Sequence, residues 1–185
     1  MATKINILNA SERFSHVLDL LENKAQDSLV EIKKHIELPN IDIVISPCSE
    51  EYKAESGILG CVSTPYVIDV LLDTDRKDLS NIINNELTSV IAHELHHVIR
   101  ASFGVQEKSL LQVLVSEGLA CHFETKFSDD ATSKFFADIK NMNGVIYIAK
   151  CKLIWKVLIL ITLCISVVKI WLNFQIERAT GLALI

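Results

Sequence analysis

The stretch that decides the fold is SNIINNELTSVIAHELHHVIRASFG, residues 80–104. Its apolar residues recur at helical spacing: Ile83, Leu87, Val90, Ile91 and Val98. Such spacing gives a helix one apolar stripe that packs against a core. Ser80 is a residue type that caps helix N-termini, and Gly104 suits the position after a helix C-terminus. We therefore expect one long helix over this stretch.

Two segments ahead of this helix are predicted to form strands. Residues 41–45 (IDIVI) are rich in β-branched side chains and end at a Ser-Pro pair, as strands often do. Residues 66–72 (YVIDVLL) are typical of a second, well-buried strand. Between them, Gly57 and Gly60 interrupt the pattern.

Two further helices complete the predicted fold. One should begin near Asn9 and stop before Pro39, because the residue before a proline disfavours the helical conformation. The other should run from about Ser109 to Phe127, antiparallel to the long helix. We predict an α+β fold with a small mixed sheet, the long helix and this antiparallel partner.

The composition is that of an acidic globular protein. The 185 residues are 50% hydrophobic with a net charge of −5, enough for one domain with a sizeable core. The scattered Lys and Arg residues argue against nucleic acid as a partner, since its backbone rewards a concentrated positive face. Five cysteines without a CxxC pair indicate a reduced compartment. The N-terminal residues lack an apolar signal segment, so we expect a cytoplasmic protein.

The long helix contains an H-E-x-x-H motif at residues 93–97. Positions four apart lie on one face of a helix, so His93 and His97 can direct their imidazoles at one zinc ion. Glu94 lies beside that face and can accept a proton from a water that the zinc activates. The motif therefore predicts Zn²⁺ as cofactor, two metal ligands and a general base.

A catalytic zinc normally takes three protein ligands, and the segment S-E-G-L-A at residues 116–120 offers a carboxylate. His97 lies about 10 Å of helical rise before the expected end of its helix, and Glu117 lies about 12 Å into the next one. The levels match, so Glu117 is the expected third ligand. The same arithmetic puts Glu107 too close to the turn and Glu124 below the level of the histidines.

Three neighbouring side chains have alternative roles. His96 could ligate in principle, but a supporting or surface role fits better because the outer histidines leave the glutamate in its usual place. His122, five residues after Glu117, points away from it on an ideal helix. Its structural role competes with binding of the substrate or the oxyanion. Cys121 lies on the face of Glu117, either near a zinc-bound histidine or simply as a small buried residue.

The sequence Ala92-His93-Glu94-Leu95-His96-His97, followed by S-E-G-L-A, resembles the gluzincin class of zinc metallopeptidases. It is more closely similar to an uncharacterised, mainly bacterial family of predicted zinc-dependent proteases, over roughly residues 41–127. The resemblance implies a zincin-like fold. It also implies that His93, His97 and Glu117 are zinc ligands and that Glu94 is the catalytic base.

The resemblance carries three further implications. It implies a peptide-binding edge strand, which we expect to be Tyr66–Leu72. Many gluzincins have an acidic residue four positions after the ligand glutamate, which orients a zinc-bound histidine and so tunes metal affinity; this chain has Cys121 there and lacks that support. The group that stabilises the tetrahedral intermediate is not assigned by the motifs; the candidates are Tyr66, Tyr147 and His122.

Residues 153–172 form an apolar run, LIWKVLILITLCISVVKIWL. Its uncharged core, residues 157–168, is closer to a buried helix than to a membrane span. With Lys156 and Lys169 as snorkelling flanks, the run reaches about the twenty residues that a span requires. A span would leave the N-terminal domain in the cytoplasm, because lysines precede it. Both alternatives stay open.

We predict a zincin-like metallopeptidase domain over residues 1–127 and an apolar helical tail over residues 128–185. The expected function is zinc-dependent hydrolysis of peptide bonds in a peptide or protein substrate, with Glu94 as general base. The alternative is a catalytically weak or inactive metal-binding module, with a membrane anchor through residues 153–172.

Overall fold

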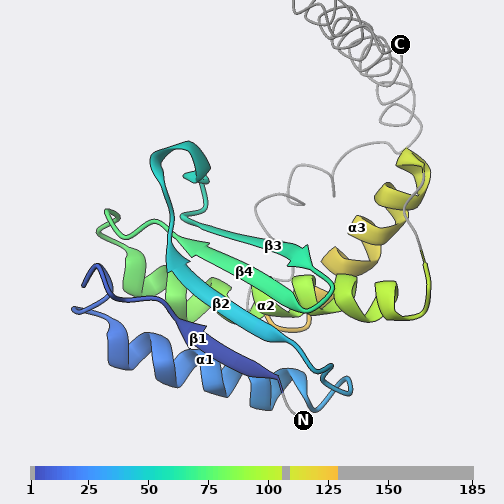
Figure 1. Cartoon of the computed structure of the whole chain (residues 1–185), viewed down its shortest axis with the longest axis horizontal. Helices are drawn as coiled ribbons and strands as arrows, with labels where there is room; N and C mark the ends of the chain where they lie inside the picture. The colour runs from blue at the N-terminus through green and yellow to red at the C-terminus, as the bar shows by residue number, and fades with distance from the viewer. Residues whose placement is uncertain (1–2, 106–108, 129–185) are drawn as a thin grey trace, which may run out of the picture. The chain divides into compact units, whose positions relative to one another are not determined.

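The structure, a computed structural model, describes residues 3–105 and 109–128. The described residues form a four-stranded mixed sheet and three α-helices, which confirms the predicted α+β class (Figure 1). In chain order the elements are β1 (Lys4–Ile7), α1 (Leu18–Ile32), β2 (Asp42–Pro47), the 3-10 turn η1 (Glu50–Tyr52), β3 (Ile58–Thr64), β4 (Val67–Leu72), α2 (Leu79–Ser102) and α3 (Leu110–Glu124).

The strand order in the sheet is β1-β2-β4-β3. Strands β1, β2 and β4 are parallel, and β3 runs antiparallel to β4. The prediction that Tyr66–Leu72 is the edge strand is therefore wrong, because β4 lies between β2 and β3. The edge strands are β1 and β3, and the sequence pattern hides β3 because Gly57 and Gly60 resemble strand breakers.

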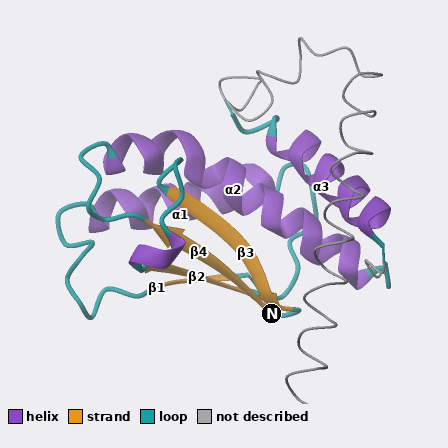
Figure 2. Cartoon of the chain, turned by 90° about the horizontal axis from the view of Figure 1, so that it is seen from above, coloured by secondary structure: helices purple, strands orange, loops and turns teal. Residues whose placement is uncertain are grey.

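Helices α1 and α2 cover the same face of the sheet (Figures 1 and 2). Alternate side chains of the two central strands point into this layer and are fully buried, as the period of two along a strand requires. They are Ile43, Ile45, Ile68, Val70 and Leu72. From α2 they meet the buried residues Ile83, Leu87, Ile91 and Leu95. The predicted apolar stripe of the long helix thus forms the centre of the core.

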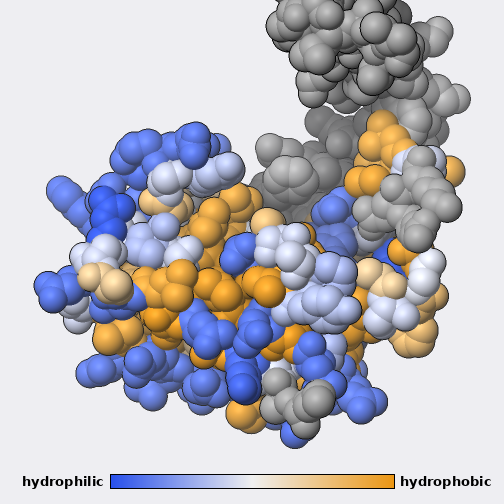
Figure 3. All heavy atoms as spheres, in the orientation of Figure 1, coloured by the Kyte–Doolittle hydropathy of each residue, from blue (hydrophilic) through white to orange (hydrophobic). Residues whose placement is uncertain are grey.

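The other face of the sheet is partly apolar as well. Figure 3 shows apolar side chains gathered over the strands on the side turned away from α1 and α2. Val44, Val67 and Leu71 are half-buried there, and Leu59 is 38% exposed.

The first helix begins later than predicted. Residues 10–17 form turns, with Glu12 at a positive φ of 58°, and α1 starts at Leu18. The side chain of Asn9 accepts a hydrogen bond from the backbone N–H of Phe14 at 2.8 Å. Asn9 therefore closes a loop rather than capping a helix. Strand β1, which spans four residues, was not predicted.

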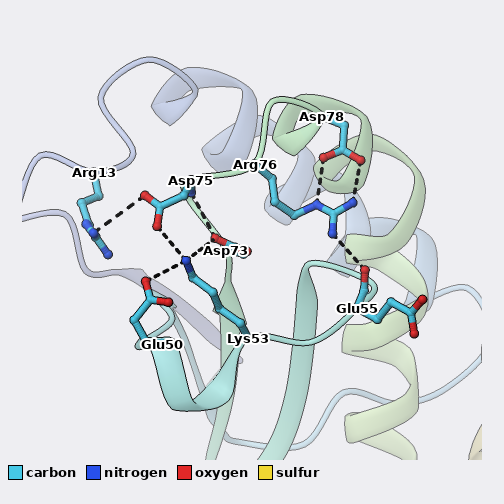
Figure 4. Close-up of polar contacts among 8 residues, drawn as sticks. All are labelled: Arg13, Glu50, Lys53, Glu55, Asp73, Asp75, Arg76 and Asp78. Atoms are coloured by element: carbon cyan, nitrogen blue, oxygen red, sulfur yellow. Dashed lines mark hydrogen bonds and ion pairs between the residues drawn. The ribbon is translucent and has the colours of Figure 1, made fainter.

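Ion pairs hold the segment that leads into α2 (Figure 4). Lys53, from the loop before β3, lies 2.8 Å from Glu50, 2.9 Å from Asp75 and 3.7 Å from Asp73. Arg76 pairs with Asp78, the residue before α2, through two hydrogen bonds of 2.8 Å. Each of these exposed pairs adds little stability on its own. Together they connect the loop before β3 with the loop that leads from β4 to α2.

The two helices of the predicted site end and begin close to where they were expected. Gly104 follows α2 with a φ of +75°, as a C-terminal glycine should. Ser109 caps α3, its side chain accepting from the backbone N–H of Gln112. Helix α3 buries Ser116, Ala120 and Phe123. Most of its other apolar residues are exposed: Leu110, Leu111, Leu114, Val115 and Leu119.

The proposed tail lies outside the described residues, apart from Ser128. So do the apolar run 153–172, Tyr147 and Glu107. Within the part of the chain that the structure describes, no helix has both the length and the apolar character needed to cross a membrane.

Candidate metal centre

The three residues predicted to bind metal come together between α2 and α3. The Nε2 atoms of His93 and His97 lie 3.0 Å apart. A carboxylate oxygen of Glu117 lies 3.3 Å from the first nitrogen, and the other oxygen lies 3.5 Å from the second. These three side chains form one of two groups of described residues that could hold a metal ion.

The spacing of these atoms fits zinc. In a tetrahedral site with bonds of about 2.0–2.2 Å, ligand atoms lie about 3.3–3.6 Å apart. The two Nε2 atoms lie 3.0 Å apart, and each has one of the two Glu117 oxygens at 3.3 or 3.5 Å, which is close to that range. The donor set of two imidazoles and one carboxylate is also one that zinc uses in hydrolytic enzymes. Glu117 is about half exposed, which leaves the centre open to solvent on that side.

Helix α3 also contacts the outer nitrogens of both histidines. Nδ1 of His93 lies 2.6 Å from a carboxylate oxygen of Glu124, and Nδ1 of His97 lies 3.2 Å from the hydroxyl of Ser116. The expectation that Glu124 lies below the histidine level is therefore wrong. The later residue of α3, Glu124, meets the earlier histidine, and Ser116 meets the later one, so the two helices pass the site in opposite directions, as predicted.

These contacts bear on the protonation of His93. An ionised carboxylate can only accept a hydrogen bond, so the contact between Glu124 and His93 requires a proton on Nδ1 of His93. Burial lowers the pKa of His93, but the hydrogen bond to Glu124 and the carboxylates of Glu124, Glu94 and Glu117 more than offset this, and the pKa is raised. In the neutral ring, Nε2 then carries the lone pair that faces His97.

Glu94 lies beneath the edge strand. It is 8% exposed, and its side chain packs directly on Gly60 of β3. A Cβ at Gly60 would lie 2.7 Å from Cγ of Glu94 and 2.8 Å from its Oε1. The pKa of Glu94 is raised to about 7, mainly by burial. The carboxylates of Glu117 and Glu124 add to this rise, whereas His93 and a hydrogen bond with the Val62 backbone oppose it. A carboxyl group with this pKa is suited to accept and return a proton near neutral pH.

The remaining candidates differ in their distance from this centre. The ring of His96 packs on Phe123, with centroids 5.9 Å apart. Cys121 is half-buried, and its sulfur lies within 4.8 Å of ligand atoms of His93 and Glu124. Its pKa is raised to about 11 by burial and by the two nearby carboxylates of α3. His122 is exposed, and Tyr66 is 72% exposed in the turn between β3 and β4.

Two side chains at the centre, Ser116 and Glu124, were not predicted to act there. Ser116 belongs to the S-E-G-L-A segment and is fully buried, and its position next to Glu117 was the available signal. Glu124 follows Glu117 by seven residues, which is close to two full helical turns and so keeps both on one face.

A comparison with known protein families gives one match. The model of a family described as "Predicted Zn-dependent protease (DUF2268)" matches residues 21–146. This range contains the H-E-x-x-H motif, the S-E-G-L-A segment and strands β2 to β4. No curated protein and no solved structure matches the chain.

Proposed function

The chain belongs to the family of predicted Zn-dependent proteases (DUF2268), and from this membership we propose that it is a gluzincin-type zinc metallopeptidase. The observation that carries the proposal is the convergence of three side chains beside a buried carboxyl group: the two Nε2 atoms lie 3.0 Å apart, and each has a carboxylate oxygen of Glu117 at 3.3 or 3.5 Å. In this proposal His93, His97 and Glu117 hold the zinc, and Glu94 is the general base.

Each group has a distinct task. A zinc ion bound by these residues supplies Lewis acidity, which polarises a peptide carbonyl and makes a water easier to deprotonate. Glu94 takes the proton from the attacking water and then donates it to the nitrogen of the leaving amine. Its pKa of about 7 allows it to do both. The packing of Gly60 and the Val62 backbone on Glu94 keeps the carboxyl group in one place.

The edge strand offers a place for the substrate. Within the described residues, β3 pairs only with β4, so one side of its backbone is free for a further strand. The same strand lies directly over Glu94. A peptide added to β3 in extended form would therefore pass next to the base. This replaces Tyr66–Leu72 as the proposed peptide-binding strand.

The proposal is tested with Glu94→Gln, which keeps the size of the side chain and removes the base. We expect the variant to bind one zinc per chain and to lose about two to four orders of magnitude in turnover, the usual contribution of a general base. The assay is cleavage of unfolded casein, and the zinc content is measured by atomic absorption. Glu86→Gln is the matched control, because Glu86 is an exposed glutamate of the same helix.

The outcomes separate the two candidate functions. Turnover that depends on Glu94 supports the peptidase. Wild-type turnover in Glu94→Gln contradicts the mechanism. Stoichiometric zinc without turnover in the wild-type protein favours the alternative, a metal-binding module.

A further inference from the structure

Glu124 contacts a proposed zinc ligand without pointing at the metal position itself. We propose that Glu124 is the positioning residue for His93, holding the ring so that Nε2 is presented to the zinc as an unprotonated donor. The inference rests on the proposed zinc site, although it does not require that the protein cleave peptides.

The contact has the geometry of a strong hydrogen bond. The distance of 2.6 Å between Nδ1 of His93 and Oε2 of Glu124 is at the short end of the range, as expected when the acceptor is charged. Both side chains are largely shielded, at 16% and 18% exposure, so water competes weakly for the same groups. A carboxylate at Nδ1 fixes the tautomer, sets the plane of the ring and increases the basicity of Nε2.

The position of Glu124 in its helix explains how it reaches His93. Seven residues after Glu117 it lies on the same face, about 20° short of two full turns. Side chains of a helix lean toward its N-terminus, so Glu124 reaches back toward Glu117. Because α3 runs opposite to α2, that direction leads to His93, the earlier of the two histidines.

The two histidines meet different kinds of group in α3. His97 has a neutral partner, the Ser116 hydroxyl, at the longer distance of 3.2 Å. A hydroxyl can donate or accept, so Ser116 alone does not fix the tautomer of His97. Glu124 is therefore the charged group of α3 that keeps the proton of His93 on Nδ1 and leaves Nε2 available to the metal.

Cys121 provides a test of this role, because it lies one turn before Glu124 with its sulfur within 4.8 Å of ligand atoms of His93 and Glu124. An aspartate at position 121 would place carboxylate oxygens slightly further from the helix than the present sulfur. The double variant Cys121→Asp/Glu124→Ala should therefore return a carboxylate to the vicinity of the His93 ring. Cys121→Ala alone serves as the control for a change on the same face.

The experiment measures zinc affinity by competition with a chromophoric chelator, and the tautomer of His93 by ¹⁵N NMR of the zinc-free protein. We expect Glu124→Ala to bind zinc 10- to 100-fold more weakly, the usual effect of losing such a partner. Glu124→Gln should fall between it and the wild type. In both variants the proton of His93 should move away from Nδ1. The double variant should recover most of the affinity, and Cys121→Ala should match the wild type.

Several results would overturn the proposal. They are a zinc affinity of Glu124→Ala within threefold of the wild type, an unchanged tautomer, and failure of the double variant to recover affinity. If Glu124→Ala does not fold, Glu124→Gln and the double variant decide the question. Binding of two zinc ions, the second lost in Cys121→Ala, would show that Cys121, His93 and Glu124 form a metal site of their own. Because no substrate is used, a protein that binds zinc through Glu124 without cutting peptides refutes only the proposed function.

Discussion

Glu94 is held in an environment that opposes its charge. The carboxyl group lies under β3 with 8% of its residue exposed, and two further carboxylates, those of Glu117 and Glu124, raise its pKa after burial has done so. Its pKa rises from 4.5 to about 7 in the zinc-free protein. A protein that keeps such a group trades stability for a base that titrates near neutral pH.

This trade predicts how stability depends on pH. The folded protein binds the Glu94 proton more tightly than the unfolded chain, so stability is lost as pH rises from about 4.5 to about 7. Without zinc, Glu94→Gln should therefore be more stable than the wild type at pH 8, by at most roughly 3 kcal/mol, and nearly equal to it at pH 4. Urea unfolding at both pH values measures this. A difference that does not change with pH, or an equal gain in Glu86→Gln, would contradict it.

At this scale the sequence predicts the motif residues better than their partners. His93, Glu94 and His97 are predicted from a period of 3.6, and in the structure the two histidines lie side by side next to the buried Glu94. Helical rise compared with His97 alone puts Glu124 below the histidines. His93 lies one turn earlier than His97, however, and a glutamate side chain is long enough to reach across a turn. Gly60 carried no signal, because only its approach to Glu94 in three dimensions explains why a glycine stands there.

Strand β3 shows how an edge strand can also be part of the site. Its backbone approaches α2 so closely that position 60 has no room for a side chain: a Cβ would lie 2.8 Å from Cγ1 of Val90 as well as against Glu94. If Gly57 and Gly60 are treated as strand breakers, β3 is not predicted and β4 is taken as the edge strand. The parallel core strands were predictable from their β-branched runs, but their order in the sheet depends on contacts far apart in the sequence.

Gly60→Ala should therefore weaken both the fold and the reaction. We expect a loss of about 1–3 kcal/mol in stability, typical of overpacking, and lower turnover because Glu94 is displaced. Gly118→Ala is the comparison: Gly118 lies in α3, and a Cβ added there would meet no described atom within 4 Å. Gly118→Ala should increase the free energy of unfolding by about 0.5–1 kcal/mol, because alanine favours the helical conformation more than glycine does. Urea unfolding and casein cleavage report both effects; equal behaviour of the two variants would count against the close packing of β3.

Across the described domain, the proposed metal lies between two helices that pack against each other, α2 and α3. Helix α2 lies in the core, whereas α3 buries only Ser116, Ala120 and Phe123 and leaves most of its other apolar residues exposed. The proposed third ligand and both partners of the histidines come from α3. Zinc bound between the helices would therefore hold α3 in place as well as activate the substrate.

Removal of zinc should loosen α3 before the rest of the fold. Amide hydrogen exchange in α3 should accelerate when a chelator is added, while exchange in β2 and β4 stays slow. Zinc at a thousand times its Kd should stabilise the protein by about 4 kcal/mol. Glu117→Gln should lose most of this gain, whereas Glu86→Gln should keep it. Uniform exchange in the presence and absence of zinc would show that α3 is held by packing alone.

The placement of these groups along the chain also orders events during synthesis. The base, Glu94, leaves the ribosome first, and thirty residues separate it from Glu124. At roughly 5–20 residues per second, this delay lasts about 2 to 6 seconds. During that interval the nascent chain carries two histidines and a base without the helix that completes the centre. The chain therefore cannot assemble its proposed metal centre until both helices are translated.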